Sequence, residues 1–130
     1  MVKMDHCGMP HANVSNATEQ QLYTRMSAAL NATGRPIVFS LCQWGEDAVW
    51  EWGGDVAQMF RVQMDHLPFW NLPTKAAGAG FGQGTKQIIE WMATLRPSAI
   101  SRAYAHPDPD FLMTLYQPTM DFTARPAEPE

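Results

Sequence analysis

The chain has 130 residues, 45% of them hydrophobic, which suits one domain with a buried core. Its net charge is −4 and its nine Lys and Arg residues are spread thinly, so it lacks the basic patch expected of a nucleic-acid or anionic-membrane partner. The longest apolar run, residues 37–41, is too short to span a bilayer. We therefore expect no nucleic acid and no membrane partner, whereas neutral or sugar-like ligands are allowed.

The predicted elements alternate between strands and helices, which is typical of βα units and a parallel sheet. A short strand at residues 2–5 precedes a polar loop and then a helix that opens with a capping box at residues 18–21. Gly34 ends this helix. Its predicted apolar face consists of Leu22, Met26, Ala29 and Leu30.

Residues 36–41 form a nearly continuous apolar stretch, which predicts a second strand covered on both faces. An aromatic loop with Trp50 and Trp52 follows, and a short helix is expected before the next strand. Residues 59–62 then predict a third short strand.

The last part of the chain predicts one more helix and one more strand. A glycine-rich loop at residues 76–84 precedes a helix over residues 85–95, which Pro97 ends. Residues 100–106 are expected to form the fourth strand, followed by a turn at residues 107–110.

Charged side chains stand at two of the predicted strand ends. Alternation places Lys3 and Asp5 on one side of the first strand, with Asp5 at its tip, and a second tip carries Arg61 and Asp65. An ammonium group beside a carboxylate keeps it ionised, as a nucleophile must be. Glycoside hydrolysis needs two carboxyl groups, but the spacing of these two aspartates alone favours ordinary surface or capping roles.

Four segments in sequence order, residues 3–7, 34–45, 61–65 and 108–112, together resemble glycoside hydrolase family 27, the α-galactosidases of clan D. The resemblance covers residues 1–123, leaving residues 124–130 as an expected disordered tail. It implies an α/β fold, namely a partial (β/α)8 TIM barrel of about four βα units from the middle of the barrel. A barrel of this size would leave two open sheet edges.

The resemblance also implies roles for individual residues. In that family the Lys-x-Asp-x-Cys segment carries the nucleophile, which matches Asp5, and the Arg-x-x-x-Asp segment carries the acid/base, which matches Asp65. Lys3 is then expected to bind sugar hydroxyls, and Arg61 to orient the acid/base and bind the sugar ring.

Two further segments are similar to sugar-binding loops of the family. The turn at residues 42–45, with Cys42 and Trp44, is similar to the loop around the 2-hydroxyl of galactose; packing of Trp44 with other tryptophans under a loop is the competing interpretation. Asp110 matches an aspartate that touches the sugar, although His106 stands where the family has tryptophan.

Cys7 and Cys42 are both expected to lie among the substrate-binding residues. In many family members the cysteine matching Cys7 forms a disulfide with one on a preceding strand, which this sequence does not contain; pairing with Cys42 is also open. Three glycosylation sequons, at Asn13, Asn16 and Asn31, favour a secreted glycoprotein if they are used, and no signal peptide is visible.

The resemblance implies a retaining α-galactosidase that removes terminal α-linked galactose through a covalent glycosyl-aspartate intermediate, and the 130-residue chain alone is expected to be inactive. The alternatives are an α-N-acetylgalactosaminidase or β-L-arabinopyranosidase specificity, or a non-catalytic truncated fragment. No cofactor or metal is expected. His6, Cys7 and His11 suit zinc by residue type but lack a well-spaced fourth ligand, and residues 79–84 do not match a phosphate loop.

Overall fold

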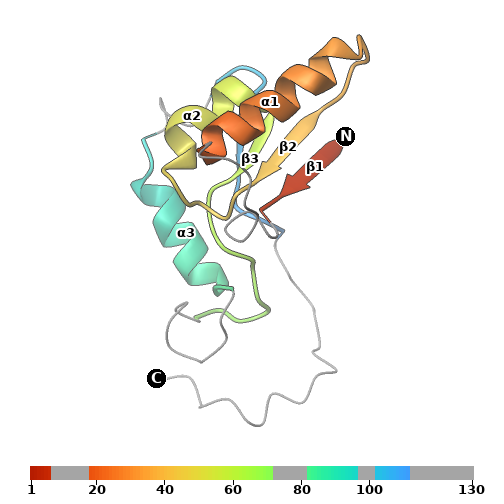
Figure 1. Ribbon diagram of the computed structural model, residues 1–130. Helices are drawn as coiled ribbons and strands as arrows, with labels where there is room; N and C mark the ends of the chain where they lie inside the picture. The colour runs from red at the N-terminus through yellow and green to blue at the C-terminus, as the bar shows by residue number, and fades with distance from the viewer. Residues whose placement is uncertain (7–17, 72–81, 97–101, 112–130) are drawn as a thin grey trace. The chain divides into compact units, whose positions relative to one another are not determined.

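The structure is a computed structural model that describes residues 1–6, 18–71, 82–96 and 102–111. Strands and helices alternate along the described chain (Figure 1). The strands are β1 (Val2–Asp5), β2 (Phe39–Cys42), β3 (Met59–Arg61) and β4 (His106–Asp108). The helices are α1 (Glu19–Ala32), α2 (Val49–Val56) and α3 (Thr85–Thr94).

The four strands form one parallel sheet in the order β1-β2-β3-β4. Asp5 lies beside Cys42 at the carboxyl ends of β1 and β2, and Arg61 lies beside Asp108 at the ends of β3 and β4. The predicted α/β class with a parallel sheet is therefore confirmed. Within the described residues, β1 and β4 are the edge strands.

The two faces of the sheet differ in polarity because side chains alternate along each strand and neighbouring strands are in register. One face is mostly polar and carries Lys3, Asp5, Ser40, Cys42, Met59, Arg61, His106 and Asp108. The opposite face is apolar and carries Val2, Met4, Phe39, Leu41, Phe60 and Pro107. The candidate chemistry is thus confined to one face.

Helix α2 packs on the apolar face, and α1 packs beside it. A Cβ atom on Gly53 of α2 would lie 2.8 Å from Cγ of Phe60, so the helix and β3 approach closely at a residue without a side chain. The Ser27 hydroxyl of α1 donates to the Val56 carbonyl of α2 at 2.7 Å. The buried Tyr23 hydroxyl donates to the Cys42 carbonyl at 3.2 Å, which ties α1 to the end of β2.

The chain divides into two compact units, each described by itself. Residues 1–62 and 96–108 form the first unit, which contains the whole sheet with α1 and α2. Residues 63–95 and 109–130 form the second unit, in which α3 is the described helix. No helix among the described residues combines the length and apolar character needed to cross a membrane.

One local prediction is confirmed and another is wrong in part. The Thr18 side chain accepts the Gln21 N–H at 3.3 Å, and the Gln21 side chain accepts the Thr18 N–H at 3.0 Å, so the capping box is present. The predicted apolar face of α1 is wrong in part, because Ala29 is exposed and the fully buried residue is Tyr23. Residues 124–130 lie outside the described residues.

Two other local predictions are wrong. The short helix expected between the second and third strands is present as α2, but Trp50 and Trp52 lie in it rather than in a loop, since packing against Phe60 stabilises a helix that contains two glycines. The fourth strand lies at His106–Asp108 instead of residues 100–106, and it includes part of the predicted turn. Its Pro107, which lacks an N–H donor, is tolerated because β4 is an edge strand of the described sheet.

Candidate active site

Asp5 is the exposed carboxylate at the carboxyl end of β1. Its Oδ1 atom accepts the backbone N–H of His6 at 2.9 Å, and its side chain also forms a hydrogen bond with the thiol of Cys42 on the neighbouring strand. These contacts orient the carboxylate, while its exposure leaves it accessible to a ligand.

Charged groups from the two neighbouring strands, β1 and β3, surround Cys42. Burial raises the pKa of the Cys42 thiol to about 11; Arg61 and Lys3 lower it, and the charge and hydrogen bond of Asp5 raise it further. Arg61 is only 2% exposed, and its Nη1 atom lies 4.0 Å from the Cys42 sulfur. The fold therefore brings together Lys3, Asp5, Cys42 and Arg61, which the sequence predicted as site residues.

The loop after β2 carries the predicted residue Trp44. Its backbone φ of 59° lies in the left-handed region, and the indole lies 5.2 Å from the His6 ring between centroids, with the two planes tilted by 50°. Trp52 instead packs beside Tyr23 and donates its indole N–H to the Asp47 carbonyl at 2.9 Å. Two separate contacts thus take the place of the expected tryptophan cluster: Trp44 lies against His6, and Trp52 packs beside Tyr23.

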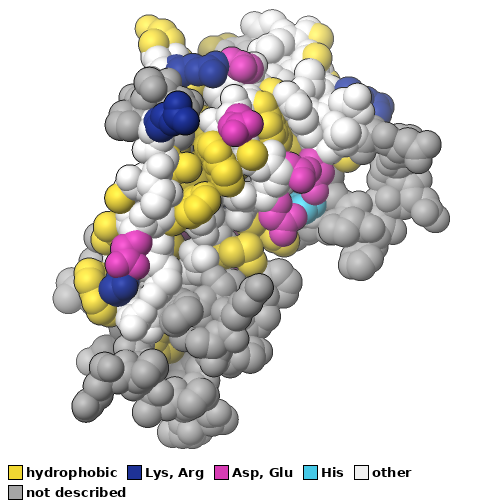
Figure 2. Space-filling view, turned by 90° about the vertical axis from the view of Figure 1, so that its left-hand side faces the viewer, with side chains coloured by type: hydrophobic (Ala, Val, Ile, Leu, Met, Phe, Trp, Pro, Cys, Tyr) yellow, Lys and Arg dark blue, Asp and Glu magenta, His cyan; other side chains and the backbone are white. Residues whose placement is uncertain are grey.

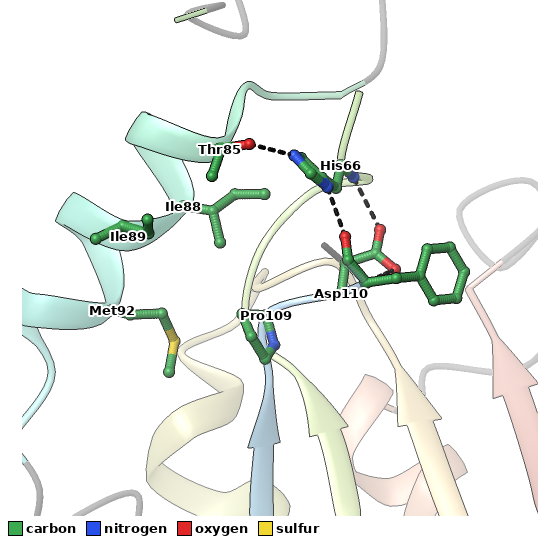
Figure 3. A pocket seen from close by; sticks show the side chains of 8 residues that line it. His66, Thr85, Ile88, Ile89, Met92, Pro109 and Asp110 are labelled. Atoms are coloured by element: carbon green, nitrogen blue, oxygen red, sulfur yellow. Dashed lines mark hydrogen bonds between the residues drawn. The ribbon is translucent and has the colours of Figure 1, made fainter. Parts of the chain in front are cut away.

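The second unit holds Asp65 and Asp110. Asp65 is exposed, and its carbonyl accepts the N–H of Gln83 at 2.8 Å. Asp110 accepts the N–H of His66 through Oδ2 at 2.8 Å and that of Phe111 through Oδ1 at 2.9 Å (Figure 3). Because His66 directly follows Asp65, Asp110 fixes the backbone on the carboxyl side of the predicted acid/base.

His66 is a buried histidine beside the predicted acid/base that the sequence did not single out. It is 6% exposed; Nδ1 contacts the carbonyl of Phe111, and Nε2 lies 2.7 Å from the Thr85 hydroxyl (Figure 3). A carbonyl only accepts, so Nδ1 carries the proton, and in the neutral ring Nε2 accepts from Thr85. The available signal was a histidine directly after an expected catalytic aspartate.

A cavity of about 320 Å³ lies beside His66 in the second unit. Apart from His66, Thr85 and Asp110, its lining is apolar, as Figure 3 shows: Ile88, Ile89, Met92, Pro109 and Phe111. A galactose ring carries several hydroxyl groups that need polar partners. The mostly apolar lining of this cavity therefore does not suit a sugar.

The structure does not give the relative positions of some of the predicted residues. Cys7 and His11 lie outside the described residues, and Cys42 forms no disulfide within them. Asp5 belongs to the first unit and Asp65 to the second, so each carboxylate is described in its own surroundings.

On the face in Figure 2, the described Lys and Arg side chains are few and intermixed with Asp and Glu.

The first unit has a parallel sheet with helices packed on its apolar face and ionisable side chains at the carboxyl ends of its strands. This arrangement defines the class, an α/β protein with a candidate active site where β/α enzymes carry theirs. The sequence profile of the Melibiase_2 family, described as alpha galactosidase A, matches residues 1–114. The chain therefore belongs to this family, glycoside hydrolase family 27, a family of glycosidases.

Individual relatives agree with this assignment. Alpha-galactosidase mel1 of Schizosaccharomyces pombe is 47% identical over 64 residues, covering 49% of this chain and 15% of the relative. Alpha-galactosidase A of Cellvibrio japonicus is 35% identical over 98 residues, covering 75% of this chain and 23% of the relative.

A crystal structure of a candidate alpha-galactosidase from Bacteroides fragilis is similar with a TM-score of 0.56 at 30% identity. The similarity covers 74% of this chain and 21% of that one. The chain thus matches a minor part of the length of each of these relatives.

Proposed function

We propose that this chain supplies the nucleophile and the acid/base of a retaining α-galactosidase. The observation that carries the proposal is the surroundings of Asp5: an exposed carboxylate at a strand end, hydrogen-bonded by the His6 N–H and the Cys42 thiol. The charges of Lys3 and Arg61 act on the same cluster. An ionised, oriented and accessible carboxylate is what attack on an anomeric carbon requires.

In this proposal Asp5 attacks the anomeric carbon and forms a covalent galactosyl-aspartate, while Asp65 donates a proton to the departing oxygen. Asp65 then removes a proton from water, which attacks the intermediate and releases galactose with retained configuration. Asp110 holds the peptide that follows Asp65 through the His66 N–H. Lys3 binds sugar hydroxyls.

The substrate class is terminal α-linked galactose on an oligosaccharide or glycoconjugate. The family assignment and the names of the relatives support this choice. The same two carboxyl groups would serve an α-N-acetylgalactosaminidase or a β-L-arabinopyranosidase, so the substrate panel below includes both. A truncated, non-catalytic role predicts neither turnover nor covalent labelling.

We also propose that the four-stranded parallel sheet is part of an eight-stranded β/α barrel. Its strand order, its parallel direction and its similarity to the Bacteroides fragilis structure support this. Sugar-binding side chains in such a barrel come from the ends of several strands. The 130-residue chain assayed alone is therefore expected to be inactive.

A chimera tests the proposed function. Residues 1–114, which the family profile matches, replace the corresponding segment of the Cellvibrio japonicus alpha-galactosidase A, and folding is verified by a cooperative thermal transition. Hydrolysis of nitrophenyl α-galactoside is compared with that of the α-N-acetylgalactosaminide and the β-L-arabinopyranoside. A mechanism-based fluorosugar of α-galactosyl configuration should label Asp5, as peptide mass spectrometry would show. A folded chimera that is labelled at another residue, or not at all, contradicts the proposal.

The cellular location is proposed to be extracellular, as a glycoprotein. Of the three sequon asparagines, Asn31 is described and is exposed near the carboxyl end of α1. Expression through a eukaryotic secretory pathway, followed by enzymatic removal of N-glycans, should lower the apparent mass. An unchanged mass would contradict glycosylation.

A further inference from the structure

His6 lies between two glutamates that come from different parts of the first unit. It directly follows β1, whereas Glu19 is the first residue of α1 and Glu46 lies in the loop after β2. One ring nitrogen of His6 and one carboxylate oxygen from each glutamate lie within 4.8 Å of one another. The fold thus gathers three groups that are common ligands of divalent metals.

The environment of the His6 ring is unusual for a histidine that only stabilises the core. The side chain is 2% exposed, with Nε2 2.6 Å from Oε1 of Glu19 and Nδ1 3.8 Å from Oε2 of Glu46. Neither ring nitrogen nevertheless makes a hydrogen bond of acceptable geometry within the described residues. Buried polar atoms normally have hydrogen-bond partners, so these two nitrogens suggest a ligand of another kind, such as a metal ion.

Gln43 provides a second, independent observation. Its side chain is completely buried, and its Nε2 atom donates to Oε2 of Glu19 at 2.6 Å. This bond holds one oxygen of Glu19 and leaves Oε1 directed at His6. A hydrogen bond to the distant oxygen of a ligating carboxylate is the usual way in which proteins orient metal ligands. The Oε1 atom of Gln43 has no hydrogen-bond partner among the described residues.

We propose that His6, Glu19 and Glu46 bind a divalent transition-metal ion, with zinc as the best fit, and that Gln43 orients Glu19. Zinc accepts one imidazole nitrogen and two carboxylate oxygens at about 2.0–2.2 Å and keeps water as a fourth ligand. Such bond lengths place ligand atoms about 3.4 Å apart in a tetrahedron, so the His6–Glu19 pair, now at 2.6 Å, must open while Glu46 approaches. Glu46, whose side chain is 56% exposed, is the group able to move inward.

The site would connect the end of β1, the first turn of α1 and the loop after β2. The proposal concerns a binding site that is separate from the two proposed catalytic carboxylates. Its test uses no turnover, so it does not depend on the proposed function.

The competing interpretation is a protonated His6 that forms ion pairs with both glutamates. Protonation would give each ring nitrogen a hydrogen, and no metal would be bound. The two interpretations differ in how the ring nitrogens respond to a metal ion, which can be measured directly.

The experiment adds Zn²⁺ or Co²⁺ to the metal-free 130-residue chain at neutral pH. We expect one equivalent to bind by calorimetry, intense visible Co²⁺ absorption typical of a four-coordinate site, and a large nitrogen chemical-shift change at His6. Absence of the Co²⁺ bands, together with His6 nitrogens that respond to pH but not to Zn²⁺, would overturn the proposal. This measurement needs no variant and so does not depend on a variant folding.

Variants then locate the ligands. His6→Ala should abolish one-equivalent binding, and Glu19→Gln and Gln43→Leu should each weaken it about 10–100-fold. Glu51→Gln is the matched control, because Glu51 is an exposed glutamate of α2 in the same unit, and it should bind as the unaltered chain does. Equal affinities for the control and the other three variants would place the metal elsewhere and contradict the assignment.

Discussion

The carboxylate of Asp110 accepts the backbone N–H of His66 at 2.8 Å, although the two residues are 44 positions apart. The same carboxylate accepts the N–H of Phe111 at 2.9 Å, while the His66 ring contacts the Phe111 carbonyl and lies 2.7 Å from the Thr85 hydroxyl. These contacts link the segment after Asp65 to the segment after β4 and to the first turn of α3. An aspartate expected from sequence to contact sugar therefore also has a structural role.

Replacing Asp110 should destabilise the second unit. Asp110→Ala removes two hydrogen bonds to a charged acceptor, and we expect a loss of about 2 kcal/mol in the free energy of unfolding. Urea denaturation measures the loss, and amide hydrogen exchange at His66 should accelerate.

The control for Asp110 is Glu90→Ala, which removes an exposed ion pair with Lys86 in α3. Pairs of this kind contribute about 0.3–0.5 kcal/mol. Equal losses for the two variants would contradict a structural role for Asp110.

Gly53→Ala should destabilise the packing of α2 on β3. Helix propensity alone predicts a gain of about 1 kcal/mol, but the added Cβ would lie 2.8 Å from Cγ of Phe60, and overpacking costs about 1–3 kcal/mol. The neighbouring Gly54→Ala is the matched control, since its nearest contact is Cβ of Ala105 at 3.2 Å. Thermal unfolding should rank Gly53→Ala as the less stable variant; the reverse order would refute this packing argument.

The stability of the chain should fall as the pH rises from 9 to 11, partly because of Cys42. Burial, the largest cause, raises the pKa of this thiol from 9.0 to about 11. Above pH 9 the unfolded chain releases this proton first, so the folded state binds more protons and loses relative stability until about pH 11. Below pH 9 the thiol is protonated in both states and adds no pH dependence.

Unfolding free energies of the unaltered chain and Cys42→Ala, measured from pH 8 to 11, test the Cys42 prediction. The variant should show a smaller decrease over this range, because other titrating groups contribute equally to both proteins. Native Cys42 should also react slowly with iodoacetamide at pH 8.5, compared with the unfolded chain. Identical pH profiles would show that burial does not raise this pKa.

In the chimera, substitutions of the two proposed catalytic aspartates should affect turnover differently. Asp5→Ala should abolish turnover with every leaving group, because no covalent intermediate forms. Asp65→Ala should still react with an activated nitrophenyl substrate, whose departure needs little proton donation, and then hydrolyse the intermediate slowly. A nitrophenol burst and acceleration by azide would reveal this step. Equal losses for both variants with all leaving groups would mean that the roles are assigned wrongly.

Features that depend on neighbours in the sequence were predicted well. The capping box at Thr18 and Gln21 forms because its two hydrogen bonds join residues three positions apart. Lys3 and Asp5 share a face because side chains alternate along any strand. Family membership was likewise available from short motifs, since each motif lies within a few consecutive residues.

Other features depend on contacts between distant residues. The position of β4 depends on pairing of Met59 with His106, and α2 tolerates Gly53 because Phe60 fills the space beside it. Likewise, no spacing rule joins His6 to Glu19 and Glu46, which meet because a strand end, a helix start and a loop are brought together by folding. Local patterns thus determine faces and caps, whereas the partners of buried polar groups depend on tertiary packing, because those partners come from residues far apart in the chain.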